Sequence, residues 1–146
     1  YLSPILDGFN GEVVSFNLSI SPNLKQIKEM LKDAFERNPV VTGLIFHSDQ
    51  GWQYQHFSYI HELKEKGIQQ SMSRKGNSMD NGMMESFFGI LKSEMFYGEE
   101  HTFKNLQELR KAITEYIEYY NVKRIKVKLK GLSPVAYRTQ VLQLHQ

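Results

Sequence analysis

The chain has 146 residues, of which 40% are apolar and 23% charged, and its formal net charge is +2. This length and composition predict one ordinary globular domain and argue against a disordered chain. The absence of cysteine excludes disulfides, thiolate zinc sites and cysteine nucleophiles, and the short, interrupted apolar stretches predict no membrane span.

The first 20 residues predict a β-hairpin. A first strand over residues 1–6 is followed by turn-forming residues over 7–11. A second strand over 13–20 alternates in polarity, and we expect its apolar side to carry Val14, Phe16, Leu18 and Ile20.

Three further elements are predicted between residues 21 and 67. Ser21 is the expected N-cap of a helix that ends at residues 38–39. The uniformly apolar run 43–46 is typical of a strand buried on both faces. A second helix is predicted over 54–66, with Phe57, Ile60 and Leu63 facing inward.

The remaining chain predicts one strand over 68–72, a loop over 73–77 and three helices, over 79–96, over 105–120 and after Ser133-Pro134. Strands that alternate with helices after a hairpin predict an α/β fold with a mixed sheet flanked by helices. The segment from Asn121 to Gln146 contains six basic residues and no Asp or Glu, so it is either a solvated tail or a phosphate-contacting segment.

Two acidic residues are candidates for chemistry. Asp49 follows the buried strand, and ligands bind at the carboxyl ends of strands in open α/β sheets, although an Asp there can also simply cap a turn. Glu85 shares one face of the long helix with Asn81, Gly89 and Lys92, which is also the pattern of an ordinary solvated face.

The spacing of Asp49 and Glu85 and the sequence around them favour a chemical role over an ordinary turn cap and a solvated helix face. Thirty-five residues lie between Asp49 and Glu85, and the flanking segments read HSDQGWQY (47–54) and SMDNGMMESFFGILKSE (78–94). Together with Tyr119-Tyr120-Asn121, Arg124 and the segment LSPVAYR (132–138), they resemble the integrase core of bacterial insertion-sequence DDE transposases, which are relatives of retroviral integrases.

The resemblance implies a ribonuclease-H-like fold and an Asp, Asp, Glu triad, of which Asp49 and Glu85 are the second and third members. The family's first Asp lies on a strand before residues 1–6, so we expect this chain to lack that Asp and the first central strand. Asp7 is not expected to replace it, because Asp7 ends the first hairpin strand. The expected organisation is a partial catalytic core over 1–122 and a basic segment with a short helix over 123–146.

The implied activity is metal-dependent cleavage of transposon ends and strand transfer into target DNA. Two Mg²⁺ or Mn²⁺ ions about 3.5–4 Å apart can stabilise the attacking and leaving oxygens of such a reaction, and carboxylates are suitable ligands. With one carboxylate missing, we expect the 146 residues to be inactive or nearly so. Zinc is not expected at His47, His56 and His61, which have no cysteine partners.

The resemblance also suggests residues that contact DNA: Arg74, Lys75, Asn81, Lys92, Lys123 and Arg124. Lys92 can equally be solvated and Asn81 can equally cap a helix. Trp52 and Tyr54 could stack on a base or pack in the core.

Two other functions remain open: a non-catalytic remnant that folds and binds DNA, and a ribonuclease-H-like nuclease acting on RNA–DNA hybrids. An open strand edge beside residues 43–46 predicts a homo-oligomer. The expected address is the bacterial cytoplasm, since no secretory leader is visible.

Overall fold

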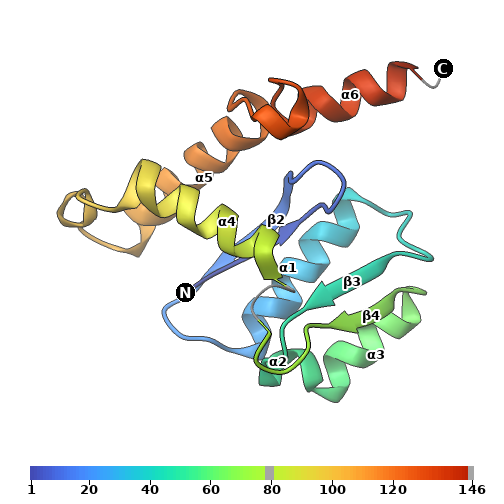
Figure 1. The fold of residues 1–146 in the computed structure, drawn as a ribbon. Coiled ribbons are helices and arrows are strands. Elements are labelled where there is room, and N and C mark those ends of the chain that lie inside the picture. Colours follow the sequence, from blue (N-terminus) through green and yellow to red (C-terminus); the bar gives the residue numbers. More distant parts are fainter. Residues whose placement is uncertain (78–80, 145–146) are drawn as a thin grey trace. The chain divides into compact units, whose positions relative to one another are not determined.

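The computed structural model describes residues 1–77 and 81–144 (Figure 1). The chain divides into two compact units, each built from two stretches of sequence. The first unit comprises Tyr1–Pro4 and Ser15–Glu85, and the second comprises Ile5–Val14 and Ser86–Gln146.

The predicted hairpin is confirmed as β1 (Leu2–Leu6) and β2 (Val13–Leu18). Its base belongs to the first unit, where the backbones of Tyr1 and Ser19 exchange hydrogen bonds of 2.8 and 2.9 Å. The prediction of which side of the second strand is apolar is partly wrong, since Ile20 is 81% exposed whereas Ser15 is buried. Ser15 tolerates burial because its hydroxyl lies 3.0 Å from the Met30 carbonyl oxygen and 2.7 Å from an Asp33 carboxylate oxygen.

Helix α1 (Leu24–Arg37) follows the hairpin in the first unit. Its N-cap is Asn23 rather than the predicted Ser21, because the Asn23 side chain accepts a 2.7 Å hydrogen bond from the Gln26 N–H. The buried Gln26 side chain in turn donates to the carbonyls of Tyr1 and Asn17, which fixes the helix to the base of the hairpin.

A parallel pair of strands, β3 (Ile45–Ser48) and β4 (Gln69–Met72), forms a second sheet in the first unit. Ile45 is in register with Gln69, and Ser48 with Met72. The prediction of a strand buried on both faces is wrong, since Leu44 is 50% and Ile45 66% exposed. The reason is that, among the described residues, β3 pairs only with β4 and the hairpin forms a separate sheet.

The helix predicted over 54–66 is two helices, α2 (Trp52–Gln55) and α3 (Phe57–Glu65). His56 breaks the helix with an extended backbone (ψ 138°), and its ring nitrogen accepts from the Ser58 N–H and caps α3. Within α3, Leu63 is buried as predicted, together with Tyr59 one turn before it. The prediction was wrong for Phe57 and Ile60, which are exposed.

Helix α4 (Gly82–Leu91) begins at the end of the first unit and continues into the second. Two residues of the predicted helix, 79 and 80, lie outside the described residues. After Leu91 the chain forms a π-helical turn, Lys92–Phe96, in which the Tyr97 N–H donates to the Lys92 carbonyl across five residues.

Helices α5 (Leu106–Val122) and α6 (Pro134–Leu144) form most of the rest of the second unit, with short 3-10 turns at Glu100–Thr102 and Val127–Leu129. Asn105 caps α5 by accepting from the Glu108 N–H at 2.9 Å. The helix predicted over 105–120 is confirmed, and its buried face carries Ile113, Tyr116, Ile117 and Tyr120.

The tip of the hairpin packs against these helices within the second unit. The Asn121 side chain accepts from the Val13 N–H at 2.8 Å and donates to the Val13 carbonyl at 3.0 Å. Arg138 forms salt bridges with Asp7 and Glu12. Asp7 directly follows β1, and its carboxylate is held by Arg138 and by the Phe9 N–H. No helix in residues 1–77 and 81–144 is long and apolar enough to span a membrane.

Candidate active site

Asp49 follows the last residue of β3, where the chain turns toward α2. One of its carboxylate oxygens accepts a 2.7 Å hydrogen bond from the Gly51 N–H, which fixes the side chain at the strand end. A Cβ atom at Gly51 would lie 2.9 Å from that oxygen, so a larger residue would disturb the carboxylate. The local turn therefore both exposes and orients Asp49.

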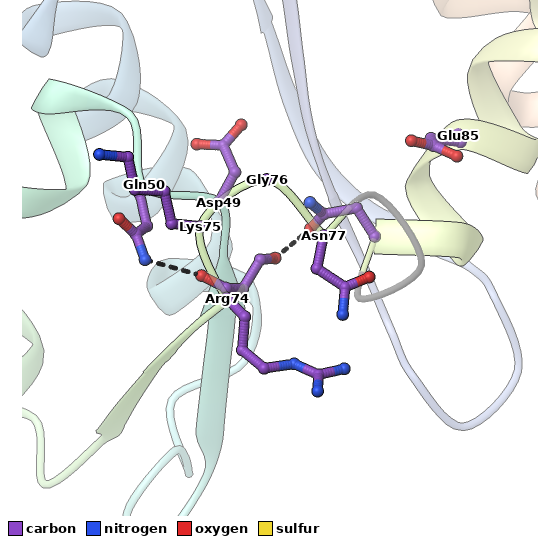
Figure 2. Close-up of a pocket in the computed structure, with 9 residues that line it drawn as sticks. Asp49, Gln50, Arg74, Lys75, Gly76, Asn77 and Glu85 are labelled. Carbon is purple, nitrogen blue, oxygen red and sulfur yellow. Dashed lines mark hydrogen bonds between the residues drawn. The ribbon is translucent and has the colours of Figure 1, made fainter.

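Glu85 lies in the first turn of α4, a position that favours a negative side chain through the helix dipole. Figure 2 shows Glu85 across from Asp49, with Gly76 and Asn77 between them. Asp49 comes from a strand end and Glu85 from a helix, and both line one pocket.

These residues line an open pocket of about 360 Å³ in the first unit. Its lining consists of Asp49, Gln50, Ser73, Arg74, Lys75, Gly76, Asn77, Asn81 and Glu85. Five predicted site residues are thus brought together, whereas Gln50, Ser73 and Asn77 were missed. Ser73 directly follows β4, just as Asp49 follows β3, and the carboxyl ends of adjacent parallel strands share one edge. The sequence offered only the place of Ser73 after a predicted strand, and the pairing of the two strands comes from the structure.

The pocket carries charges of both signs. Arg74 turns away from Asp49 and Glu85 in Figure 2, which leaves the carboxylates uncovered by its guanidinium.

The pKa of the neighbouring Tyr54 is raised by burial and, to a smaller extent, by the negative charge of Asp49. Tyr54 also packs edge-on against Tyr59 with a centroid separation of 5.4 Å, and Trp52 is 57% exposed.

The donor set suits a hard divalent cation, since the pocket supplies two carboxylates and several amide and hydroxyl oxygens. Within the described part of the chain, no group of three or more His, Cys, Asp or Glu side chains could hold a metal ion. Among the described residues, the acidic side chains that line the pocket are Asp49 and Glu85.

The remaining predicted DNA contacts, Lys92, Lys123 and Arg124, belong to the second unit. Lys92 is exposed, with its ammonium 5.9 Å from the Phe88 ring centroid, and Lys123 is exposed. Arg124 instead binds Glu94 through bonds of 2.8–3.0 Å. Tyr116 also donates to Glu94 at 2.8 Å, so Arg124 is part of a polar cluster of Glu94, Tyr116 and Arg124.

Solved structures define the class of fold. The catalytic core domain of BIV integrase superposes with a TM-score of 0.72 at 17% identity, covering 99% of this chain and 90% of that one. The HTLV-2 integrase catalytic core domain in complex with magnesium gives 0.69 at 16% identity, over 90% of this chain and 80% of that one. The fold is that of an integrase catalytic core, which is ribonuclease-H-like, and the α/β prediction is confirmed.

Sequence comparison gives the family. Two models described as the integrase core domain match residues 1–78 and 85–142. The putative transposase InsK for insertion sequence element IS150 of Escherichia coli is 54% identical over 96% of this chain and 49% of its own length. An uncharacterized transposase-like protein of Haemophilus influenzae is 56% identical, over 97% of this chain and 64% of its own length.

The chain therefore belongs to the integrase core family, and the predicted relationship to insertion-sequence transposases is confirmed. It spans about half to two thirds of the length of these two relatives.

Proposed function

We propose that this chain forms part of the catalytic core of an insertion-sequence transposase, and that Asp49 and Glu85 are two of the acidic metal ligands of that core. The observation that carries the proposal is their convergence on one pocket of the first unit, from the end of β3 and the first turn of α4. The family match and the similarity to named transposases support the same assignment.

The proposed cofactor is Mg²⁺ or Mn²⁺, as a pair of ions in the complete site. Such ions activate an attacking oxygen and stabilise a leaving oxygen during phosphodiester cleavage and strand transfer. Asp49 and Glu85 would provide anionic oxygen ligands, with Asp49 oriented by the Gly51 N–H. The description of the HTLV-2 core as a magnesium complex favours this choice.

The proposed substrate is DNA, both the ends of a mobile element and a target. Arg74, Lys75 and Asn81 line the pocket and are the proposed contacts of the first unit. Lys92, Lys123 and Arg124 are the proposed contacts of the second unit. The Nε and Nη2 atoms of Arg124 bond to Glu94, whereas the Lys92 and Lys123 side chains are exposed.

We also propose that the 146 residues alone do not cut DNA, because the described residues bring only two acidic ligands together. In this assignment residues 1–122 are a partial core and residues 123–146 a basic DNA-holding segment. The coding DNA upstream of Tyr1 tests this arrangement. An open frame that encodes a strand with an Asp supports a complete triad, whereas a stop codon supports a non-catalytic remnant.

Metal binding by the purified chain tests the assignment of the two ligands. We expect Asp49→Asn and Glu85→Gln each to weaken Mn²⁺ binding by about tenfold or more, because each removes one anionic ligand. Electron paramagnetic resonance of free Mn²⁺ measures the binding. Glu62→Gln, which removes the same charge elsewhere in the first unit, is the matched control. Equal binding by all four proteins would contradict the proposal.

A second copy of the chain is the proposed partner at the uncovered edge of β3. Leu44 and Ile45 are at least half exposed there, and β4 is the only strand paired with β3 among the described residues. An unpaired edge with apolar neighbours favours strand pairing between chains. We expect light scattering to give a mass above that of one chain at high concentration, and a monomer across the whole concentration range would argue against this contact.

A further inference from the structure

His47 connects the two strands that lead to the pocket. It lies on β3, two residues before Asp49, and is in register with Ser71 on β4. Its Nδ1 atom is 2.9 Å from the Ser71 hydroxyl, and its Nε2 atom is 3.0 Å from the Ser73 hydroxyl. An imidazole ring suits this place because it can accept at one nitrogen and donate at the other while holding both hydroxyls at a fixed separation.

Ser73 continues the connection toward α4. It is only 3% exposed, and its N–H donates to the Ser48 carbonyl at 2.8 Å, so its position is fixed by the sheet. Its hydroxyl lies 2.7 Å from the Asn81 side-chain oxygen. Asn81 precedes Glu85 by four residues, about one helical turn, and both line the pocket.

The direction of this hydrogen-bond chain follows from the single proton of the Ser73 hydroxyl. The Asn81 oxygen at 2.7 Å is a closer acceptor than the Ser48 carbonyl at 3.3 Å, so the proton goes to Asn81. The Ser73 oxygen must then accept from His47, which requires the proton of neutral His47 to be on Nε2. Nδ1 is left as an acceptor for the Ser71 hydroxyl.

We propose that His47 is a positioning residue, which as the Nε2–H tautomer holds Ser73 and through it orients the Asn81 side chain at the pocket. His47 itself contacts the two serines rather than the proposed metal ligands. The effect is to tie the carboxyl ends of β3 and β4 to the residue one turn before Glu85. The purpose of this arrangement rests on the proposed function, but the hydrogen-bond chain can be tested without metal or DNA.

The tautomer is the first test. Long-range ¹H–¹⁵N correlation spectra of the metal-free chain, recorded near pH 8, distinguish the two ring nitrogens of His47. We expect His47 to be protonated at Nε2 and unprotonated at Nδ1. Protonation at Nδ1, or rapid exchange between both forms, would overturn the proposed direction.

Variants test the effect on Asn81, whose side-chain amide signals report its hydrogen bonds. We expect His47→Leu and Ser73→Ala to shift these signals beyond the line width, and His47→Gln, which keeps a donor toward Ser73, to restore them. His56→Gln is the matched control, because His56 contacts Ser58 and caps α3 instead. Unchanged Asn81 signals in Ser73→Ala, or no rescue by His47→Gln, would overturn the proposal.

These results are independent of metal binding. An intact relay together with equal Mn²⁺ binding by the Asp49 and Glu85 variants would reject the proposed function and retain the role of His47. A loss of Mn²⁺ binding in those variants together with a Nδ1–H tautomer would reject the relay and retain the function. If His47→Leu does not fold, the wild-type tautomer and Ser73→Ala still decide the question.

Discussion

Single side chains in this protein join segments that are far apart in the sequence. In the polar cluster of Glu94, Tyr116 and Arg124, one carboxylate accepts hydrogen bonds from residues 22 and 30 positions away. Tyr116 lies on the buried face of α5, and Arg124 follows the end of that helix. Both side chains bond to Glu94 in the π-helical turn. Hydrogen bonding from Arg124 is the main reason why the pKa of Glu94 is lowered, and bonding from Tyr116 adds to it. The pKa of Tyr116 is raised by burial and by its bond to Glu94.

The lowered pKa of Glu94 predicts a pH-dependent stability. Because the carboxylate is favoured in the folded state, its contribution is present above the pKa of the unfolded chain and is lost as the pH falls through the lower folded value. We expect Glu94→Gln to lower the free energy of unfolding by about 1 kcal/mol at pH 7, since a partly exposed bridge is screened by solvent. Urea unfolding at several pH values measures this difference.

The control for this experiment is Glu99→Gln, which removes an exposed carboxylate nearby in sequence. The difference between wild type and Glu94→Gln should shrink below about pH 4, close to the ordinary glutamate pKa. A constant difference down to pH 3 would show that ionisation of Glu94 is not involved.

At the scale of the elements, helix ends and breaks depend on single polar side chains. Asn23 caps α1, His56 separates α2 from α3, and Asn105 caps α5. Each accepts a hydrogen bond from a backbone N–H of the first turn that has no partner within the helix.

The cap of α1 gives a direct test between two neighbouring residues. We expect Asn23→Ala to lower the free energy of unfolding by about 1 kcal/mol, because the Gln26 N–H loses its acceptor. Asn23→Asp should restore most of this stability. Ser21→Ala is the matched control and should change stability by less than about 0.5 kcal/mol. Thermal or urea unfolding measures all three, and a larger loss at Ser21 would favour the cap expected from the sequence.

At the scale of the whole molecule, the hairpin is shared between the two compact units. Its base belongs to the first unit with α1, and its tip belongs to the second unit with α5 and α6. Contacts at the tip join residues more than 100 positions apart in the chain, as Asn121 with Val13 and Arg138 with Asp7. The segments around Asn121 and Arg138, which carry part of the family resemblance, thus hold the hairpin in place.

Asn121 provides the test of this long-range closure. We expect Asn121→Ala to lower the free energy of unfolding by about 2 kcal/mol, because the N–H and the carbonyl of the buried Val13 both lose their partner. Asn121→Asp keeps the acceptor and should cost less. Val122→Ala, at an exposed position next to it, should be nearly neutral. Equal stability of Asn121→Ala and Val122→Ala in urea would contradict the role of this contact.

Two residues of the pocket were candidates in the sequence because of the elements that carry them and the spacing between them. Asp49 follows a predicted strand, Glu85 lies on a polar helix face 35 intervening residues later, and both line the pocket. Gln50, Ser73 and Asn77 were missed because their types are common in turns, and only the parallel register of β3 and β4 brings Ser73 beside His47. Burial of Phe57 and Ile60 was predicted wrongly because the buried face of α3 is centred on Tyr59 and Leu63, and tertiary packing decides which face is covered.

The sequence by itself determined the family, the α/β class, the order of the strands and longer helices, and the two acidic candidates, since these depend on spacing, periodicity and motif. Only the tertiary structure decided that Asn23 rather than Ser21 caps α1, that β3 is exposed, that Arg124 binds Glu94 and that His47, Ser73 and Asn81 form one hydrogen-bond chain. The physical reason is that these outcomes depend on which groups from distant parts of the chain compete for each donor, acceptor and apolar face.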